Sequence, residues 1–250
     1  MLEFFLEQIQ SFTPALVLTL GLAIGLQHAF EPDHIAAVTT QISRQKKRSQ
    51  SLKEIVKKGA LKSSIIGAFW GAGHTTTLVL VGLLVYMLSV NIPDVFFISS
   101  ELIVGMMLIF LAITTISNKK LFRIKHMHPH SHKDGTVHTH PHEHGSDHKH
   151  GHRSYLIGCI HGLAGSGALL VVIAGSLSSV QDILSFILIF GVGSIIGMTL
   201  ISSLIGIPFA ISNKASSLDK TLRCVVGTVS FLIGISIVYE IVYVGKLFGF

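Results

Sequence analysis

The sequence predicts an all-α integral membrane protein with six transmembrane helices. Hydrophobic residues make up 49% of the 250 residues and charged residues only 13%, whereas soluble domains carry about 25% charged residues. Six apolar stretches reach the roughly 20 residues that a helix needs to cross a bilayer. They cover residues 13–41, 64–89, 95–117, 155–178, 183–211 and 224–246.

The positive charges predict how these helices are oriented. All Lys and Arg residues except Lys246 lie in three loops, 42–63, 118–154 and 212–223, and loops rich in Lys and Arg stay on the cytoplasmic side. We therefore expect a multi-pass protein of the cytoplasmic (inner) membrane with both termini outside. Because membrane topology explains the charges, the net charge of +6 does not indicate binding to nucleic acid.

Short matches between the two halves predict an inverted repeat of three plus three helices. The segment from Ile24 to His28 matches the segment from Ile157 to His161, and Phe69–His74 matches Ile189–Ser194. The repeats would span residues 1–117 and 155–250, with the loop 118–154 between them. Each half crosses the membrane an odd number of times, so the second half enters it from the opposite side. Such repeats place the substrate site near the middle of the membrane.

The segment His28–His34 carries two histidines, a glutamate and an aspartate inside the first apolar stretch. Charged groups at that depth are costly and usually functional. A residue on a straight helix turns by about 100°, which would place His28 about 140° from Asp33 and about 120° from His34. One ion could not then bind all three side chains. Pro32 cannot continue the preceding hydrogen-bonded turn, so we expect the first helix to be broken near Glu31-Pro32, with the side chains turned inward.

Two more histidines lie among small residues of other apolar stretches. His74 follows Gly71-Ala72-Gly73, and His161 precedes Gly162; small residues let membrane helices approach closely. Nitrogen ligands with a carboxylate suit Ni²⁺, Co²⁺ or Zn²⁺ better than Mg²⁺ or Ca²⁺. The predicted metal ligands are His28, Asp33, His34, His74 and His161, and Glu31 either joins them or faces water. Trp70 is assigned to packing.

Eleven of the 15 histidines lie between residues 126 and 152. A tract of this composition cannot build a packed core, and it is typical of a disordered loop that binds metal. These histidines are His126, His128, His130, His132, His138, His140, His142, His144, His148, His150 and His152. We expect the loop to be cytoplasmic and to receive or buffer metal, and a cytoplasmic metallochaperone is a candidate partner.

The motif His28-Ala-Phe-Glu-Pro-Asp33-His34 resembles the His-x4-Asp-His signature of the nickel/cobalt transporter (NiCoT) family. Glu31-Pro32 departs from the Asp-Ala that is usual there. Together with Trp70-Gly-Ala-Gly-His74 and the segment His161–Ala168, the motif more closely resembles the shorter urease-accessory-type (UreH-like) nickel permeases. The resemblance implies uptake of Ni²⁺ or Co²⁺ without a nucleotide-hydrolysing subunit, with His28, Asp33 and His34 as the key ligands.

These observations predict a permease, and not an enzyme, that moves Ni²⁺ or Co²⁺ by alternating access, the metal being substrate and no cofactor being tightly bound. Three alternatives remain at this point. The first is an exporter of the same metals that confers resistance, because a histidine-rich loop is compatible with either direction. The second is an intramembrane metalloenzyme, which the absence of a His-Glu-x-x-His pattern disfavours. The third is a metal sensor or store built around the loop.

Overall fold

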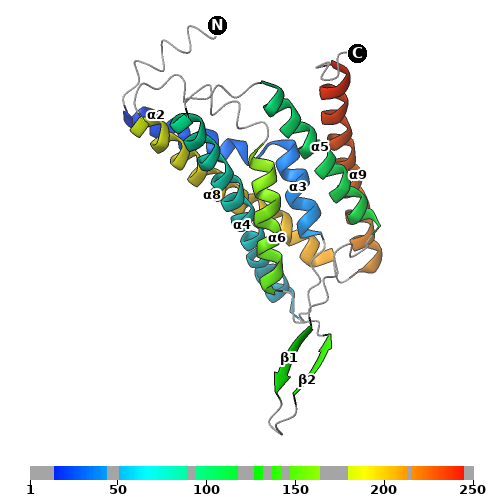
Figure 1. Cartoon of the computed structure of the whole chain (residues 1–250). Coiled ribbons are helices and arrows are strands. Elements are labelled where there is room, and N and C mark those ends of the chain that lie inside the picture. Colours follow the sequence, from blue (N-terminus) through cyan, green and yellow to red (C-terminus); the bar gives the residue numbers. More distant parts are fainter. Residues whose placement is uncertain are drawn as a thin grey trace.

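The computed structural model describes residues 14–43, 51–88, 94–117, 127–131, 137–141, 147–163, 180–212 and 215–244. Within these ranges the chain is helical except for one small β-hairpin (Figure 1). The helices are α2 (Pro14–His28), α3 (Pro32–Ile42), α4 (Leu52–Leu88), α5 (Asp94–Ile116), α6 (Asp147–Gly162), α8 (Val180–Ser212) and α9 (Ser216–Tyr239), and the π-helical turn η1 (Glu240–Val244) follows α9. The hairpin pairs β1 (Met127–Ser131) with β2 (Val137–Pro141).

Four helical segments of the described chain are long and apolar enough to cross a bilayer. They are Leu52–Leu84, Ile98–Ile116, Gln181–Ser212 and Ser216–Tyr243. Large apolar side chains on their outer faces, such as Leu80, Leu204 and Leu232, are exposed, as lipid-facing residues are. The chain is therefore a multi-pass membrane protein, and the predicted class is confirmed at this level.

The predicted break in the first helix is confirmed. Helix α2 ends at His28 and α3 begins at Pro32. Two turn hydrogen bonds connect them, from Phe30 N–H to the Gln27 carbonyl (2.9 Å) and from Glu31 N–H to the His28 carbonyl (3.1 Å). Pro32 occupies the first turn of α3, where the missing N–H would have no helical partner in any case. Pro32 thus starts the second helix segment, and does not kink a continuous one.

Three helices begin more than two turns earlier than the apolar stretches predicted. Helix α4 begins at Leu52 rather than at residue 64, α6 at Asp147 rather than 155, and α9 at Ser216 rather than 224. The prediction equated the end of the apolar stretch with the end of the helix. Polar residues can continue a helix into water; in α4, Lys58 pairs with Glu54 one turn earlier (3.4 Å). With 37 residues, α4 is about 55 Å long, well beyond the roughly 30 Å hydrocarbon layer.

The stretch 155–178 was predicted to be one continuous helix. Helix α6 instead ends at Gly162, and Leu163 forms a turn through its N–H and the Ile160 carbonyl (3.3 Å). Residues 164–179 lie outside the described part of the chain. The expectation of a single helix is therefore wrong at Gly162, where glycine readily permits a helix to end.

The histidine-rich loop was predicted to be disordered, and part of it is ordered. Strands β1 and β2 pair in an antiparallel register that sets His128 opposite His140 and His130 opposite His138. Residues 147–154 belong to α6. The hairpin stands apart from the helices (Figure 1). Composition predicts that a segment cannot form a core, but it does not exclude backbone pairing in an isolated hairpin.

Helices α2, α4, α6 and α8 pack side by side, and α5 pairs with α9 (Figure 1). Helix α3 lies between the two groups and contacts α4, α5, α8 and α9. Its buried residues Ala37, Val38 and Ile42 join an apolar core with Leu108 of α5 and Met198 of α8. The broken end of α2 and the start of α3 are therefore held inside the bundle.

Candidate metal site

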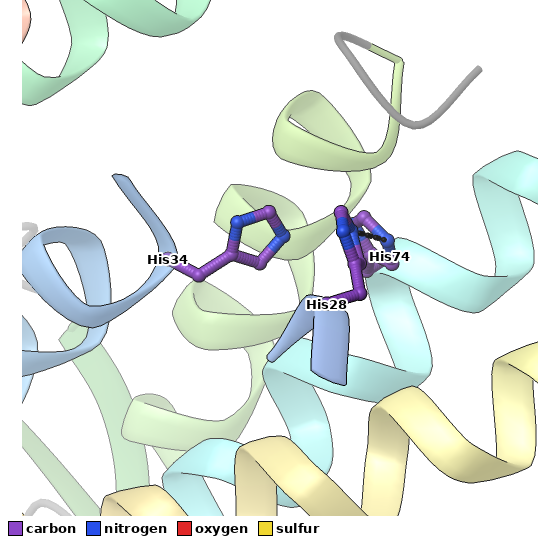
Figure 2. A group of neighbouring side chains, drawn as sticks. All are labelled: His28, His34 and His74. Carbon is purple, nitrogen blue, oxygen red and sulfur yellow. Dashed lines mark hydrogen bonds between the residues drawn. The ribbon is translucent and has the colours of Figure 1, made fainter. Parts of the chain in front are cut away.

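Three histidine rings from three helices meet at the break between α2 and α3. They belong to His28, His34 and His74, and each is at most 5% exposed. Their ring centroids lie 4.3 Å apart for His28 and His34, 5.1 Å for His28 and His74, and 5.3 Å for His34 and His74. Figure 2 shows His34 reaching from α3 toward the paired rings of His28 and His74. One ligand atom from each ring falls within 4.8 Å of the other two.

A second group of ligand atoms shares His34. It consists of Asp33, His34 and His161, whose ligand atoms also lie within 4.8 Å of one another. Nε2–H of His161 donates to Oδ2 of Asp33 at 2.9 Å, and Nδ1–H of His34 donates to Oδ1 at 3.0 Å. Asp33 thus joins a residue of α3 to one at the end of α6. The structure brings all five principal predicted ligands into one continuous cluster.

Glu31 lies beside this cluster. Its side chain is 51% exposed, and its Oε1 accepts a hydrogen bond from Nδ1–H of His28 at 2.7 Å. A carboxylate on one ring nitrogen fixes the tautomer and makes the other nitrogen a better ligand. Glu31 is therefore placed to orient His28, and neither triad of converging ligand atoms includes it.

The hydrogen bonds determine which nitrogens carry protons if the rings are neutral. His28 donates from Nδ1 to Glu31, so its Nε2 accepts, and the Nε2 atom of His74, at 3.2 Å, must donate to it. A neutral imidazole has one donor and one acceptor nitrogen. The acceptor nitrogens that remain are Nε2 of His34, Nδ1 of His74 and Nδ1 of His161.

These three acceptor nitrogens are buried and have no hydrogen-bond partner. An unpartnered buried polar atom costs about 1–3 kcal/mol, so three in one cluster require an explanation. Imidazole nitrogens with a carboxylate are good ligands for divalent transition metals. The donor set present in the cluster fits such an ion.

Two aromatic residues that sequence reasoning did not place in the site touch its histidines. The ring of Trp70 lies 5.2 Å from that of His34 and 5.5 Å from that of His161. The ring of Phe190 lies 5.4 Å from that of His28. Trp70 was assigned to packing, and Phe190 was not selected, although the repeat aligns Phe190 with Trp70 and so could have indicated it.

The threonines that follow His74 do not join the cluster of ligands. Oγ1–H of Thr75 donates to the carbonyl of Gly191 at 3.2 Å, and Oγ1–H of Thr77 donates to that of Cys159 at 3.0 Å. These bonds cross from α4 to α8 and to α6. They fix the helices that carry His74 and His161.

The loop histidines are placed only in part. His128 and His130 lie in β1, His138 and His140 in β2, and His148, His150 and His152 in α6. His126, His132, His142 and His144 lie outside the described residues. His152 is exposed.

Comparison with known proteins gives two matches. Residues 72–236 match a family described as the cytochrome C biogenesis protein transmembrane region. The chain is also 34% identical over 226 residues to a protein named urease accessory protein UreH from Bacillus sp. (strain TB-90), an alignment that covers 90% of this chain and 91% of the relative. No solved structure matches.

The relationship to a urease accessory protein confirms the resemblance seen in the sequence, whereas placement in the nickel/cobalt transporter superfamily stays a prediction. The two descriptions are of an accessory protein and of a transmembrane region, which agrees with the prediction that the chain is not an enzyme. The chain thus belongs to the family of the cytochrome C biogenesis protein transmembrane region and also to that of the urease accessory protein UreH.

Proposed function

We propose that this protein is a secondary transporter that takes up Ni²⁺, Co²⁺ or both through the His/Asp cluster. The observation that carries the proposal is the convergence of largely buried ligand atoms in two groups that share His34, namely His28, His34 and His74, and Asp33, His34 and His161. Bound metal would take up ring nitrogens of this cluster, and Asp33 would supply negative charge. The ion is cargo, so it must be able to leave; a nitrogen-rich set of ligands on separate helices can open when the helices move.

The ligand set supports a transition metal as cargo. Histidine nitrogens suit Ni²⁺, Co²⁺ and Zn²⁺, while Mg²⁺ and Ca²⁺ require mainly oxygen ligands. The name of the relative refers to urease, and the resemblance of the motifs to urease-accessory-type nickel permeases favours nickel among these metals.

Alternating access between two repeats, 1–117 and 155–250, is part of the proposal. Helices α2 and α6 both end at their matching histidine motifs, and the turns that follow are alike: Phe30 N–H bonds the Gln27 carbonyl, and Leu163 N–H bonds the Ile160 carbonyl. Helix α2 packs on α8 as α6 packs on α4. These likenesses support an inverted three-plus-three repeat, in which one half can move against the other around a central site.

The distribution of charge supports an orientation in the cytoplasmic membrane. The lysines of α4, from Lys53 to Lys62, lie at the start of that helix, and Lys220 and Arg223 lie at the start of α9. Basic residues near membrane helix ends favour the cytoplasmic side. In this orientation the hairpin and the loop 118–154 face the cytoplasm and both termini lie outside.

The loop histidines are proposed to accept metal on the cytoplasmic side. Alternate residues of a strand share one face, and in the observed register His128 lies opposite His140 and His130 opposite His138. Residues directly opposite each other have Cβ atoms about 4.5–5.5 Å apart. Four histidine positions on one face suit a divalent ion, which a cytoplasmic metallochaperone would then collect.

Accumulation of radioactive nickel in whole cells tests the proposal and its direction. Cells expressing the wild-type protein should contain more nickel than cells expressing His74→Ala. The control is Glu54→Gln, which changes an exposed residue near the start of α4, the helix that carries His74, and should behave as wild type. Lower nickel content in wild-type cells than in His74→Ala cells would indicate export, and equal contents in both would contradict transport through this site.

A further inference from the structure

Each of the two matching histidines lies against one large buried aromatic ring of the facing helix. The ring of His28 lies 5.4 Å from that of Phe190 on α8, and the ring of His161 lies 5.5 Å from that of Trp70 on α4. Phe190 is 0% exposed and Trp70 is 1% exposed. Phe190 and Trp70 hold matching places in the two halves of the sequence, as His28 and His161 do. The two contacts are therefore one arrangement used twice.

A glycine three residues before each histidine permits this contact. A Cβ atom on Gly25 would lie 2.1 Å from the carbonyl oxygen of Phe190. A Cβ atom on Gly158 would lie 2.0 Å from the carbonyl oxygen of Trp70. No side chain could be accommodated at these distances. The backbone of each aromatic residue is thus held directly against the last turn before the histidine.

A second glycine, on the helix that carries the aromatic residue, brings each pair of helices similarly close one turn away. Gly193, three residues after Phe190, would place a Cβ atom 2.5 Å from the Leu22 carbonyl oxygen. Gly73, three residues after Trp70, would place one 2.0 Å from the Tyr155 carbonyl oxygen. With close contacts at two levels, neither helix pair can slide without separating. Each aromatic ring therefore has a fixed position relative to its histidine.

We infer that Phe190 and Trp70 are positioning residues of the proposed metal site, Phe190 acting through His28 and Trp70 through His161. This inference rests on the proposed function. His28 is the last residue of α2, and His161 precedes the last residue of α6. Beyond a helix end, packing must fix the orientation of a ligand ring. A smaller side chain at either position lets that ring rotate, so that its nitrogen no longer converges with the others.

Trp70 contacts more of the proposed ligands than Phe190 does. Trp70 also lies against His34, with the ring centroids 5.2 Å apart. The place that matches His74 in the second half holds Ser194, which is buried. More of the proposed ligands therefore lie beside Trp70 than beside Phe190. We expect loss of the Trp70 ring to weaken metal binding more than loss of the Phe190 ring.

The experiment measures Ni²⁺ binding by purified full-length protein. Binding at the membrane site is taken as the difference from the double variant His28→Ala/His161→Ala, which retains the histidine loop. Phe190→Leu and Trp70→Leu should each weaken binding at this site by about tenfold or more, the range seen when groups supporting a metal ligand are removed. Trp70→Phe keeps an aromatic ring and should restore most of the affinity. Phe209→Leu makes the same change in the apolar core of α8 and should leave affinity unchanged.

A double-mutant cycle separates positioning from general packing. In a His28→Ala background, Phe190→Leu should cause no further loss of affinity, whereas Trp70→Leu still should. In a His161→Ala background Phe190→Leu should still weaken binding, and Trp70→Leu should cost less than in wild type but not nothing, because its contact with His34 remains. Full additivity of Phe190→Leu with His28→Ala, or an equal effect of Phe209→Leu, would overturn the inference. If Phe190→Leu yields no folded protein, Phe190→Met carries the same comparison, since it keeps the bulk but not the flat ring.

Failure of the inference is distinguishable from failure of the proposed function. If the double variant His28→Ala/His161→Ala binds as much Ni²⁺ as wild type, there is no metal site in the membrane and the proposed function fails. If that variant loses binding while Phe190→Leu and Trp70→Leu keep it, only the positioning roles are wrong.

Discussion

Nε2 of His28 lies 3.2 Å from Nε2 of His74, although 46 positions separate the two residues in the sequence. The contact joins the end of α2 to the interior of α4 (Figure 2). Imidazole nitrogens bind transition metals such as zinc at about 2.0–2.1 Å. Two nitrogens already this close need only small ring movements to bind one ion between them, at the cost of the hydrogen bond that now joins them.

Removal of His74 should abolish high-affinity metal binding in the membrane part of the protein. His74→Ala deletes an acceptor nitrogen and leaves His28 without its ring partner, so we expect a loss of affinity of about 100-fold or more, at or above the upper end for supporting residues. Titration of purified protein with Ni²⁺ measures this effect. Glu54→Gln, at an exposed position of the same helix, serves as the control, and an equal effect of both substitutions would show that the membrane cluster is not the binding site.

Glu31 should act on metal affinity through His28. Glu31→Gln keeps an oxygen that can accept the Nδ1–H hydrogen bond but removes the charge that makes the ring a stronger ligand. We therefore expect the affinity for Ni²⁺ to fall by about tenfold, which is the smallest loss usual when a group supporting a metal ligand is removed. This loss should be smaller than the loss caused by Asp33→Asn. The measurement is the Ni²⁺ concentration at half-maximal uptake into proteoliposomes. Glu54→Gln, at a glutamate paired with Lys58 on the surface, should change nothing; a loss as large as that of Asp33→Asn would make Glu31 a ligand.

Most of the site could be predicted from the sequence because its central segment conflicts with its surroundings. A straight helix cannot turn His28, Asp33 and His34 toward one ion, and a proline at position 32 would kink or break a continuous helix. Both facts are local, and together they predicted the break that the structure contains. His74 and His161 could be nominated because ionisable residues in apolar helices are seldom there without a function.

The remaining features depend on contacts between segments far apart in the sequence. The start of α4 at Leu52 could not be read from hydropathy, which reports the lipid boundary and not the helix boundary. The role of Glu31 depended on whether its carboxylate reached His28 or an ion, and a sequence gives no such distance. Phe190 was missed because an aromatic residue in an apolar helix is ordinary until its contact with His28 is known.

The close approach of α2 to α8 predicts unequal effects of two neighbouring glycines. A Cβ atom at Gly25 would lie 2.1 Å from a backbone carbonyl oxygen, whereas one at Gly21 would lie 3.2 Å from the side chain of Phe186, which can adjust. Gly25→Ala should therefore destabilise the protein by about 1–3 kcal/mol or more, as overpacking does, and Gly21→Ala should cost less. Thermal unfolding in detergent compares the two, and equal unfolding temperatures would contradict this helix contact.

The register of the β-hairpin predicts that the position of its histidines matters, beyond their number. Exchanging neighbours in β2 by the four substitutions Val137→His, His138→Val, Thr139→His and His140→Thr preserves composition. It moves the two histidines of this strand to the opposite face, because alternate residues face opposite sides. In full-length protein carrying His74→Ala, we expect the exchange to weaken Ni²⁺ binding by the loop by about tenfold, as loss of ligand geometry does.

The matching exchange in β1 provides the decisive control for this register. Four substitutions, Met127→His, His128→Met, Pro129→His and His130→Pro, move the histidines of β1 to the opposite face. The β1 exchange alone, like the β2 exchange alone, leaves the histidines of the two strands on opposite faces of the hairpin. Combining both exchanges returns all four histidines to a common face and sets positions 129 and 139 opposite each other, so binding should recover in part. Hydrogen exchange of the hairpin amides measures whether the strands stay paired with the proline moved to position 130. Unchanged binding in every variant would mean that the loop binds metal through its composition alone.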